Sequence, residues 1–172
     1  FNVEIIGQQE RAVKVLGGFP LTPQKTIDEC YQSSLNSDLI IVPALWRNPK
    51  PLLEKYQPTI AWLRQQYLAG ASVFAVGTGV CLLAEAGILD GKPATTHWHY
   101  LENFARDYPK VNLQTNHLLT QSDRIFCAAS VNSGADMMVH LIGLLFGRDL
   151  ALQVEQQFSP EVRNPFEKKV FY

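Results

Sequence analysis

Short apolar runs along the chain alternate with longer stretches in which apolar residues recur every three or four positions. Residues 39–42 (LIIV), 73–76 (VFAV) and 125–128 (IFCA) are continuous apolar runs between more polar segments. Runs of this kind are typical of strands buried on both faces, as the strands of parallel sheets are. Residues 1–6 alternate apolar and polar positions, and residues 94–96 form another short run, so both predict further strands.

The stretches between these runs predict helices. Pro58 stands where the first turn of a helix tolerates proline, and Gly70 follows the last apolar residue of that helix as its cap. Another helix is expected after the Gly77-Thr78-Gly79 segment, ending at Gly87, and Asn132 is the expected cap of a long buried helix. Further helices are expected over residues 26–31, 100–108, 132–146 and 150–158, with a hairpin-like segment over 111–120. Alternating strands and helices predict an α/β fold: a doubly wound, flavodoxin-like parallel sheet with helices on both faces.

The periodic pattern extends over most of the 172 residues and then stops. Nearly half of the chain (47 %) is hydrophobic, which is enough for the core of one domain. We therefore expect one domain over residues 1–158. Residues 159–172 combine Pro160, Pro165 and mixed charges without periodicity, so we expect a linker arm there.

Charge and cysteine content exclude several classes of protein. Fifteen Lys and Arg residues are balanced by sixteen Asp and Glu residues, and the basic residues are scattered along the sequence. This segment is therefore not expected to bind DNA itself. Cys30, Cys81 and Cys127 are odd in number and far apart, unlike a disulfide framework or a zinc site, and Cys81 is interpreted as a small buried hydrophobe. No apolar run reaches the length of a membrane span, and no secretory leader pattern is visible. We expect a cytoplasmic location and no membrane partner.

The sharpest turn in the predicted sheet follows residue 76, where the chain reads Val-Gly-Thr-Gly before a helix begins. In open α/β sheets, ligands bind at the carboxyl ends of strands, and such a turn often presents a nucleophile on strained backbone. Gly77 occupies that position, and glycine adopts such dihedral angles freely. The turn would therefore keep its bend without a reactive atom.

The sequence VGTGVCLLAEAGILDGKPATTHW at residues 76–98 resembles a block of the class I glutamine amidotransferase-like (PfpI-like) superfamily, and specifically the N-terminal domains of AraC-type transcriptional regulators. The resemblance covers about residues 1–158. A weaker match is VNSGADMMVHL at residues 131–141, which is similar to the family's helix after a Thr-Ser-Ala-Gly strand end. It places Asp136 on the family's acidic position, where a structural role is the preferred interpretation.

Two departures from the family pattern bear on chemistry. Gly77 falls on the family's cysteine, and the strand at 39–42 leads into Pro43-Ala44-Leu45-Trp46 instead of Pro-Gly-Gly, whose backbone can line an oxyanion site. The family's first strand and helix, which usually carry an acidic pocket residue, are also expected to precede Phe1. These departures therefore predict no catalytic residue, and we expect no cofactor and no metal.

What the resemblance implies is regulation. The domain would sense an unknown small-molecule effector, or only dimerise, as a homodimer, and DNA binding would belong to a C-terminal helix-turn-helix domain outside this chain. The predicted ligand-binding residues lie at the turn, at the histidine of the motif and after the strand at 39–42: Gly77, Thr78, Gly79, His97, Trp46 and Ala44.

Several alternatives stay open from the sequence. The chain could be a hydrolase with an unconventional nucleophile, a His97-assisted lyase, or a purely structural interaction domain whose cleft is filled by Trp46. Gly77 could serve only as a tight connection. His97 and His99 could suggest a metal, although no third ligand lies at a suitable spacing. His140, in the long helix, is interpreted as a satisfied core or interface residue.

Overall fold

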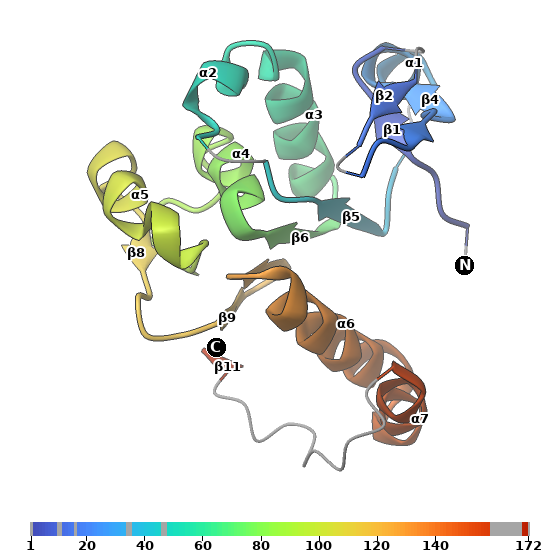
Figure 1. Cartoon of the computed structure of the whole chain (residues 1–172), viewed down its shortest axis with the longest axis vertical. Helices are drawn as coiled ribbons and strands as arrows, with labels where there is room; N and C mark the ends of the chain where they lie inside the picture. The colour runs from blue at the N-terminus through green and yellow to red at the C-terminus, as the bar shows by residue number, and fades with distance from the viewer. Residues whose placement is uncertain are drawn as a thin grey trace.

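A five-stranded sheet forms the centre of the computed structural model, which describes residues 2–9, 12–15, 17–33, 36–45, 48–158 and 170–171 (Figure 1). The strand order is β11-β9-β10-β6-β5. The strands are β5 (Leu39–Val42), β6 (Ser72–Val76), β9 (Leu119–Ser122), β10 (Ile125–Ala128) and β11 (Val170–Phe171). The three buried runs of the sequence coincide with β5, β6 and β10, and these strands are parallel to one another.

The expected doubly wound α/β architecture is confirmed, but the sheet is mixed where a purely parallel one was predicted. β9 runs antiparallel to β10, and β11 runs parallel to β9. The reason is the connection: only Asp123 and Arg124 separate β9 from β10, and so short a turn can join only antiparallel strands. The hairpin therefore spans β9 and β10, and the hairpin predicted over 111–120 is wrong.

Shorter strands lie outside this sheet. β1 (Ile6–Gly7) pairs in parallel with β4 (Lys25–Thr26), β2 (Val13–Lys14) pairs with β3 (Pro20–Leu21), and β7 (Pro93–Ala94) pairs with β8 (Asn112–Leu113). The strand predicted over residues 1–6 is wrong in extent, because among the described residues only Ile6 of that range is in a strand. Val3 and Ile5 are exposed, so the alternating pattern there finds no face to bury.

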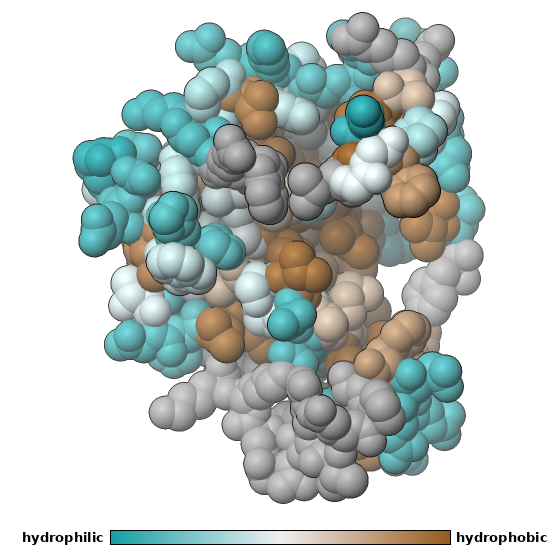
Figure 2. Space-filling model, viewed as in Figure 1, coloured by the Kyte–Doolittle hydropathy of each residue, from teal (hydrophilic) through white to brown (hydrophobic). Residues whose placement is uncertain are grey.

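Helices cover both faces of the central sheet (Figure 1). One face carries α1 (Ile27–Gln32), α3 (Gln57–Leu68) and α4 (Val80–Glu85), and the other carries α6 (Val131–Phe146), on which α7 (Arg148–Phe158) packs. The remaining helical segments are α2 (Lys50–Leu53), η1 (Gly77–Gly79), η2 (Trp98–Tyr100) and α5 (Leu101–Asp107). In the same view, Figure 2 shows hydrophilic residues over the α5 side and hydrophobic residues nearer the middle.

Alternation along β6 divides the core into two layers. Val73 and Ala75 belong to the larger cluster with the α3 and α4 side chains, whereas Phe74 belongs to a smaller cluster with Met137 and Leu141 of α6. Both faces of β6 are therefore buried, as its continuous apolar sequence indicates.

The long helix begins one residue earlier than predicted, because Ser130 and not Asn132 is its cap. The Ser130 hydroxyl accepts a hydrogen bond from the Ser133 amide, and the Ser133 side chain accepts one from the Ser130 amide. This reciprocal pair satisfies two amides at the start of the helix. No described helix is long and apolar enough to cross a membrane. The predicted linker arm lies outside the described residues except for β11.

Candidate functional site

Gly77 makes the sharp turn between β6 and α4, as the sequence predicts. Its φ of +54° lies in the left-handed region, which costs other residues roughly 1–2 kcal/mol. A Cβ atom built on Gly77 would lie 3.4 Å from Ala44 Cβ and 3.8 Å from both His97 Cβ and the Ala129 carbonyl oxygen. These are ordinary van der Waals distances. The segments that follow β5, β7 and β10 therefore converge on this turn and leave room for the Cβ atom that glycine does not have.

Two buried threonines fix this turn to its neighbours. Thr96 Oγ1 donates a hydrogen bond of 2.9 Å to the Gly77 carbonyl, and the Thr78 hydroxyl donates to the Leu45 carbonyl. Both side chains are nearly inaccessible to solvent. The Thr78 hydroxyl proton is thus used to hold the backbone, and Thr96 is a site residue that the sequence analysis did not single out.

Gly79 is required by the close approach of another backbone segment. A Cβ atom on Gly79 would lie 2.4 Å from the Pro43 carbonyl oxygen and 3.0 Å from that of Val42. Its φ of −59° is ordinary, so the requirement is one of space and not of dihedral angle. The end of β5 is therefore packed directly against the turn.

His97 stands beside the turn and is only partly buried. Its Nδ1 atom accepts a hydrogen bond of 3.4 Å from the His99 backbone amide. The neighbouring Trp98 is 72 % exposed, and its ring lies 5.7 Å from that of His97 and 5.0 Å from that of His99. Among the described side chains, no group of three or more His, Cys, Asp or Glu is placed to hold a metal ion.

The cysteines do not replace a nucleophile at the turn. Cys81 is fully buried, which confirms its interpretation as a small hydrophobe. Burial, followed by the nearby carboxylates of Glu85 and Asp107, raises the pKa of its thiol to about 12. Burial likewise raises the pKa of Cys127 to about 12. At neutral pH both thiols are protonated, and it is the thiolate that attacks.

The structure thus brings five of the six predicted ligand-binding residues into one turn and its surroundings: Gly77, Thr78, Gly79, His97 and Ala44. Gly79 lies in the same turn, but the side that a Cβ would occupy faces the Pro43 carbonyl. Trp46 lies outside the described residues.

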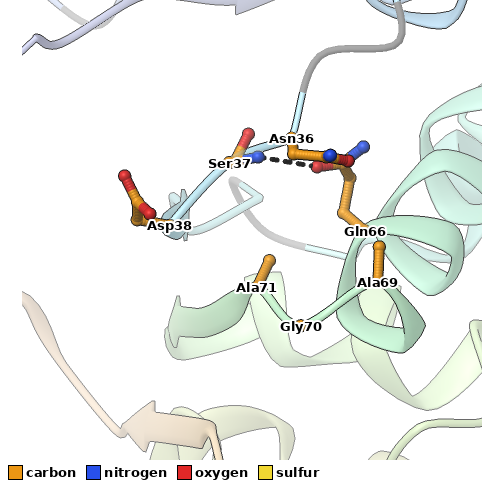
Figure 3. Close-up of a pocket in the computed structure, with 7 residues that line it drawn as sticks. All are labelled: Asn36, Ser37, Asp38, Gln66, Ala69, Gly70 and Ala71. Atoms are coloured by element: carbon orange, nitrogen blue, oxygen red, sulfur yellow. Dashed lines mark hydrogen bonds between the residues drawn. The ribbon is translucent and has the colours of Figure 1, made fainter.

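A second feature, which the sequence analysis missed, is a hollow of about 240 Å³ at the opposite, amino end of the parallel strands. It lies between residues 36–38, before β5, and residues 69–71, before β6, with Gln66 of α3 at its side (Figure 3). Its lining comes from three segments with no motif in common, so no sequence signal could have indicated it.

Comparison with known proteins agrees with the resemblance. The sequence model of the DJ-1/PfpI family matches residues 1–143. The chain is 35 % identical over 109 residues to the HTH-type transcriptional regulator CdhR of Pseudomonas aeruginosa, which is 63 % of this chain and 32 % of that protein. It is 30 % identical over 151 residues to the isonitrile hydratase of Pseudomonas putida, which is 87 % of this chain and 62 % of that protein.

Solved structures share the fold. An AraC family transcriptional regulator from Pseudomonas putida superimposes with a TM-score of 0.72 at 22 % identity, covering 90 % of this chain and 79 % of that one. A ThiJ/PfpI family protein from Pseudomonas syringae gives a TM-score of 0.79 at 18 % identity, covering 96 % and 66 %. The chain spans about a third of the length of the curated regulators it matches. By the extent of the family match, this chain belongs to the DJ-1/PfpI family.

Proposed function

We propose that this chain is the non-catalytic, ligand-sensing domain of an AraC-type transcriptional regulator. The observation that carries the proposal is Gly77: it keeps the turn at a φ of +54° and supplies no reactive side chain. The similarity to several HTH-type regulators of Pseudomonas aeruginosa supports a regulatory role. DNA binding would belong to a further domain outside this sequence.

The chemistry around Gly77 argues against covalent catalysis. Nucleophilic catalysis needs an activated atom at the turn. The cysteine of the adjacent helix, Cys81, is buried and has a pKa of about 12. Ala44 follows Pro43 where the family has a glycine pair, so its side chain stands beside the turn. The site therefore lacks both the nucleophile and the glycine-lined loop of an acyl-transfer enzyme.

The same features suit a ligand cradle. The space above Gly77 is bordered by Ala44 Cβ, His97 Cβ and the Ala129 carbonyl, and a small group of the effector would occupy it. His97 is the titratable side chain placed to contact a carboxylate or carbonyl there. Thr78 and Gly79 hold the turn in place. That Trp46 covers the ligand stays a prediction.

Association as a homodimer belongs to the same proposal. The second half of α6 and the start of α7 expose a run of large apolar side chains, and surfaces of this kind commonly mark protein contacts. They are Leu144, Leu145, Phe146 and Leu150.

A strand and helix preceding this sequence also remain a proposal. β5 is an edge strand among the described strands, and Ile41 in its middle is 52 % exposed. The unpaired edge of β5 could accept a further parallel strand, with a helix over Ile41.

A hydratase is the second candidate, favoured by the similarity to the isonitrile hydratase over 87 % of this chain. Such an activity would have to use His97 or another group in place of the thiolate. An activity screen with isonitrile, amide, ester and glyoxal-type substrates separates the two candidates.

The cradle itself is tested by binding. We expect a panel of small carboxylates, titrated into ¹⁵N-labelled protein, to contain at least one that shifts the Gly77, Thr78 and His97 resonances saturably. His97→Ala should weaken this response, and His99→Ala, a matched change two residues away, should leave it. Shifts that are unaffected by His97→Ala would count against the cradle.

A further inference from the structure

Four side chains from three segments meet at the amino end of β6 and β10, away from Gly77. Tyr67 belongs to α3, Lys92 follows α4, and Asp123 and Arg124 form the turn between β9 and β10. Lys92 Nζ donates a hydrogen bond of 2.5 Å to the Tyr67 hydroxyl, which in turn donates one of 2.9 Å to Asp123 Oδ2. These bonds fix the three segments relative to one another.

Two cationic side chains lie close to the ring of Tyr67. Lys92 Nζ lies 4.8 Å from the ring centroid and Arg124 Cζ lies 4.9 Å from it. Against these two positive charges the cluster holds one carboxylate, that of Asp123. Neither cation forms an ion pair with any carboxylate that the structure describes. The cluster therefore carries an excess of positive charge.

Most of the hydrogen-bond donors of these cations find no acceptor among the described residues. An ammonium group has three donors and a guanidinium group has five. Within the described residues Lys92 uses one of its three side-chain donors, on Tyr67, and the Arg124 side chain uses none. Both side chains are partly buried, so fewer water molecules reach them than reach a fully exposed cation. An anion with several acceptor oxygens would satisfy these donors.

The cluster borders the hollow at Gly70. Arg124 Nη1 lies 3.6 Å from the position that a Cβ atom on Gly70 would occupy, and Gly70 lines the hollow. The other walls are polar: the Ser37 amide donates a 2.9 Å hydrogen bond to Gln66 Oε1, and the Asn36 side chain lies beside that bond (Figure 3). Asp38 also lines the hollow, and in this view its carboxylate points away from Gln66.

From this arrangement we propose a second ligand site, which takes the phosphate group of a small polar phosphate monoester. Lys92 and Arg124 bind the phosphate oxygens, and the hydroxyl-bearing remainder enters the hollow beside Asn36, Ser37 and Gln66. Phosphate fits better than a single carboxylate because it offers three terminal oxygens to donors that come from two separate segments. This site is independent of the cradle at Gly77.

The test is an NMR titration of the ¹⁵N-labelled protein at constant ionic strength, with inorganic phosphate and glycerol 3-phosphate as probes and chloride as the reference salt. We expect saturable shifts of the Gly70 and Ala71 amides and of Arg124 Nε with both phosphates, and none with chloride. Glycerol 3-phosphate should bind more tightly and should also shift Ser37. Equal or weaker binding of glycerol 3-phosphate would overturn the phosphate monoester as ligand.

Variants assign the response to the two cations. Arg124→Gln and Lys92→Met should each raise the Kd by about tenfold or more, since each removes charge-assisted hydrogen bonds. Arg106→Gln, on the exposed surface of α5, is the matched control and should leave the Kd within about twofold. A wild-type titration that does not saturate, or an Arg124→Gln variant that binds phosphate like wild type, would overturn the proposal.

Discussion

The two ends of the parallel strands use their polar groups in opposite ways. At the carboxyl end, the hydroxyls of Thr78 and Thr96 both donate hydrogen bonds to backbone carbonyls. Gly77 stands at the turn where a nucleophile would be expected. At the amino end, Lys92 and Arg124 keep donors that no described side chain accepts. The described hydroxyls at the carboxyl end are thus used within the protein, whereas the two cations at the amino end keep donors for a further acceptor.

The largest effect is expected from Gly79→Ala. The added Cβ would lie 2.4 Å from the Pro43 carbonyl oxygen, so the end of β5 or the turn has to move. Overpacking of this kind costs up to about 3 kcal/mol of the free energy of unfolding. Urea denaturation measures it.

Gly91→Ala is the matched control for Gly79→Ala. Gly91 has a φ of +74° and nothing within 4 Å of its Cβ position, so only strain of about 1 kcal/mol is expected. Equal losses for the two variants would show that backbone packing at the turn is looser than described.

Thr96→Val comes next in size. It removes a buried hydrogen bond and leaves the Gly77 carbonyl without that donor, which costs about 1–2 kcal/mol. Thr115→Val, at an exposed position, should change the free energy of unfolding by less than about 0.5 kcal/mol. A Thr96→Val protein as stable as wild type would mean that the threonine does not hold the turn.

Tyr67→Phe tests the amino end and should cost about 1 kcal/mol, because it removes the hydroxyl that joins Lys92 to Asp123. Thermal or urea unfolding compares it with Tyr56→Phe, whose hydroxyl makes no hydrogen bond within the described structure. If both variants lose the same stability, the bonds between the three segments contribute nothing measurable.

The smallest change in stability is expected from His97→Ala. His97 is partly exposed and its Nδ1 accepts one long hydrogen bond, so the free energy of unfolding should fall by less than about 0.5 kcal/mol. Its effect should instead be on ligand binding at the turn. A large loss of stability would make His97 a structural residue and remove it from the cradle.

The sequence predicted the carboxyl end far better than the amino end, for physical reasons. Continuous apolar runs indicate β5, β6 and β10 directly. The Gly-Thr-Gly turn lies within one short segment, so its geometry can be predicted from the local sequence. The cap at Ser130 was missed because Asn132 is also a favourable capping residue and the reciprocal bond to Ser133 depends on coordinates.

The cluster around Tyr67 could not be predicted in the same way. Its residues are separated by up to 57 positions along the chain and carry no shared motif, so only the fold brings them together. The antiparallel direction of β9 was missed for a related reason. The two-residue turn of Asp123 and Arg124 contains no glycine, which is the usual sequence signal of such a hairpin turn.

An assay of turnover tests most directly whether the turn at Gly77 binds a ligand without catalysing a reaction. Wild-type protein, Gly77→Cys and His97→Ala should be assayed together on isonitrile, amide, ester and glyoxal-type substrates, with iodoacetamide labelling to follow the introduced thiol. We expect no turnover and no labelling of the native protein, and labelling at position 77 in Gly77→Cys, because a Cβ fits there at 3.4 Å or more from its neighbours. Turnover by the wild-type protein that His97→Ala abolishes would contradict the account.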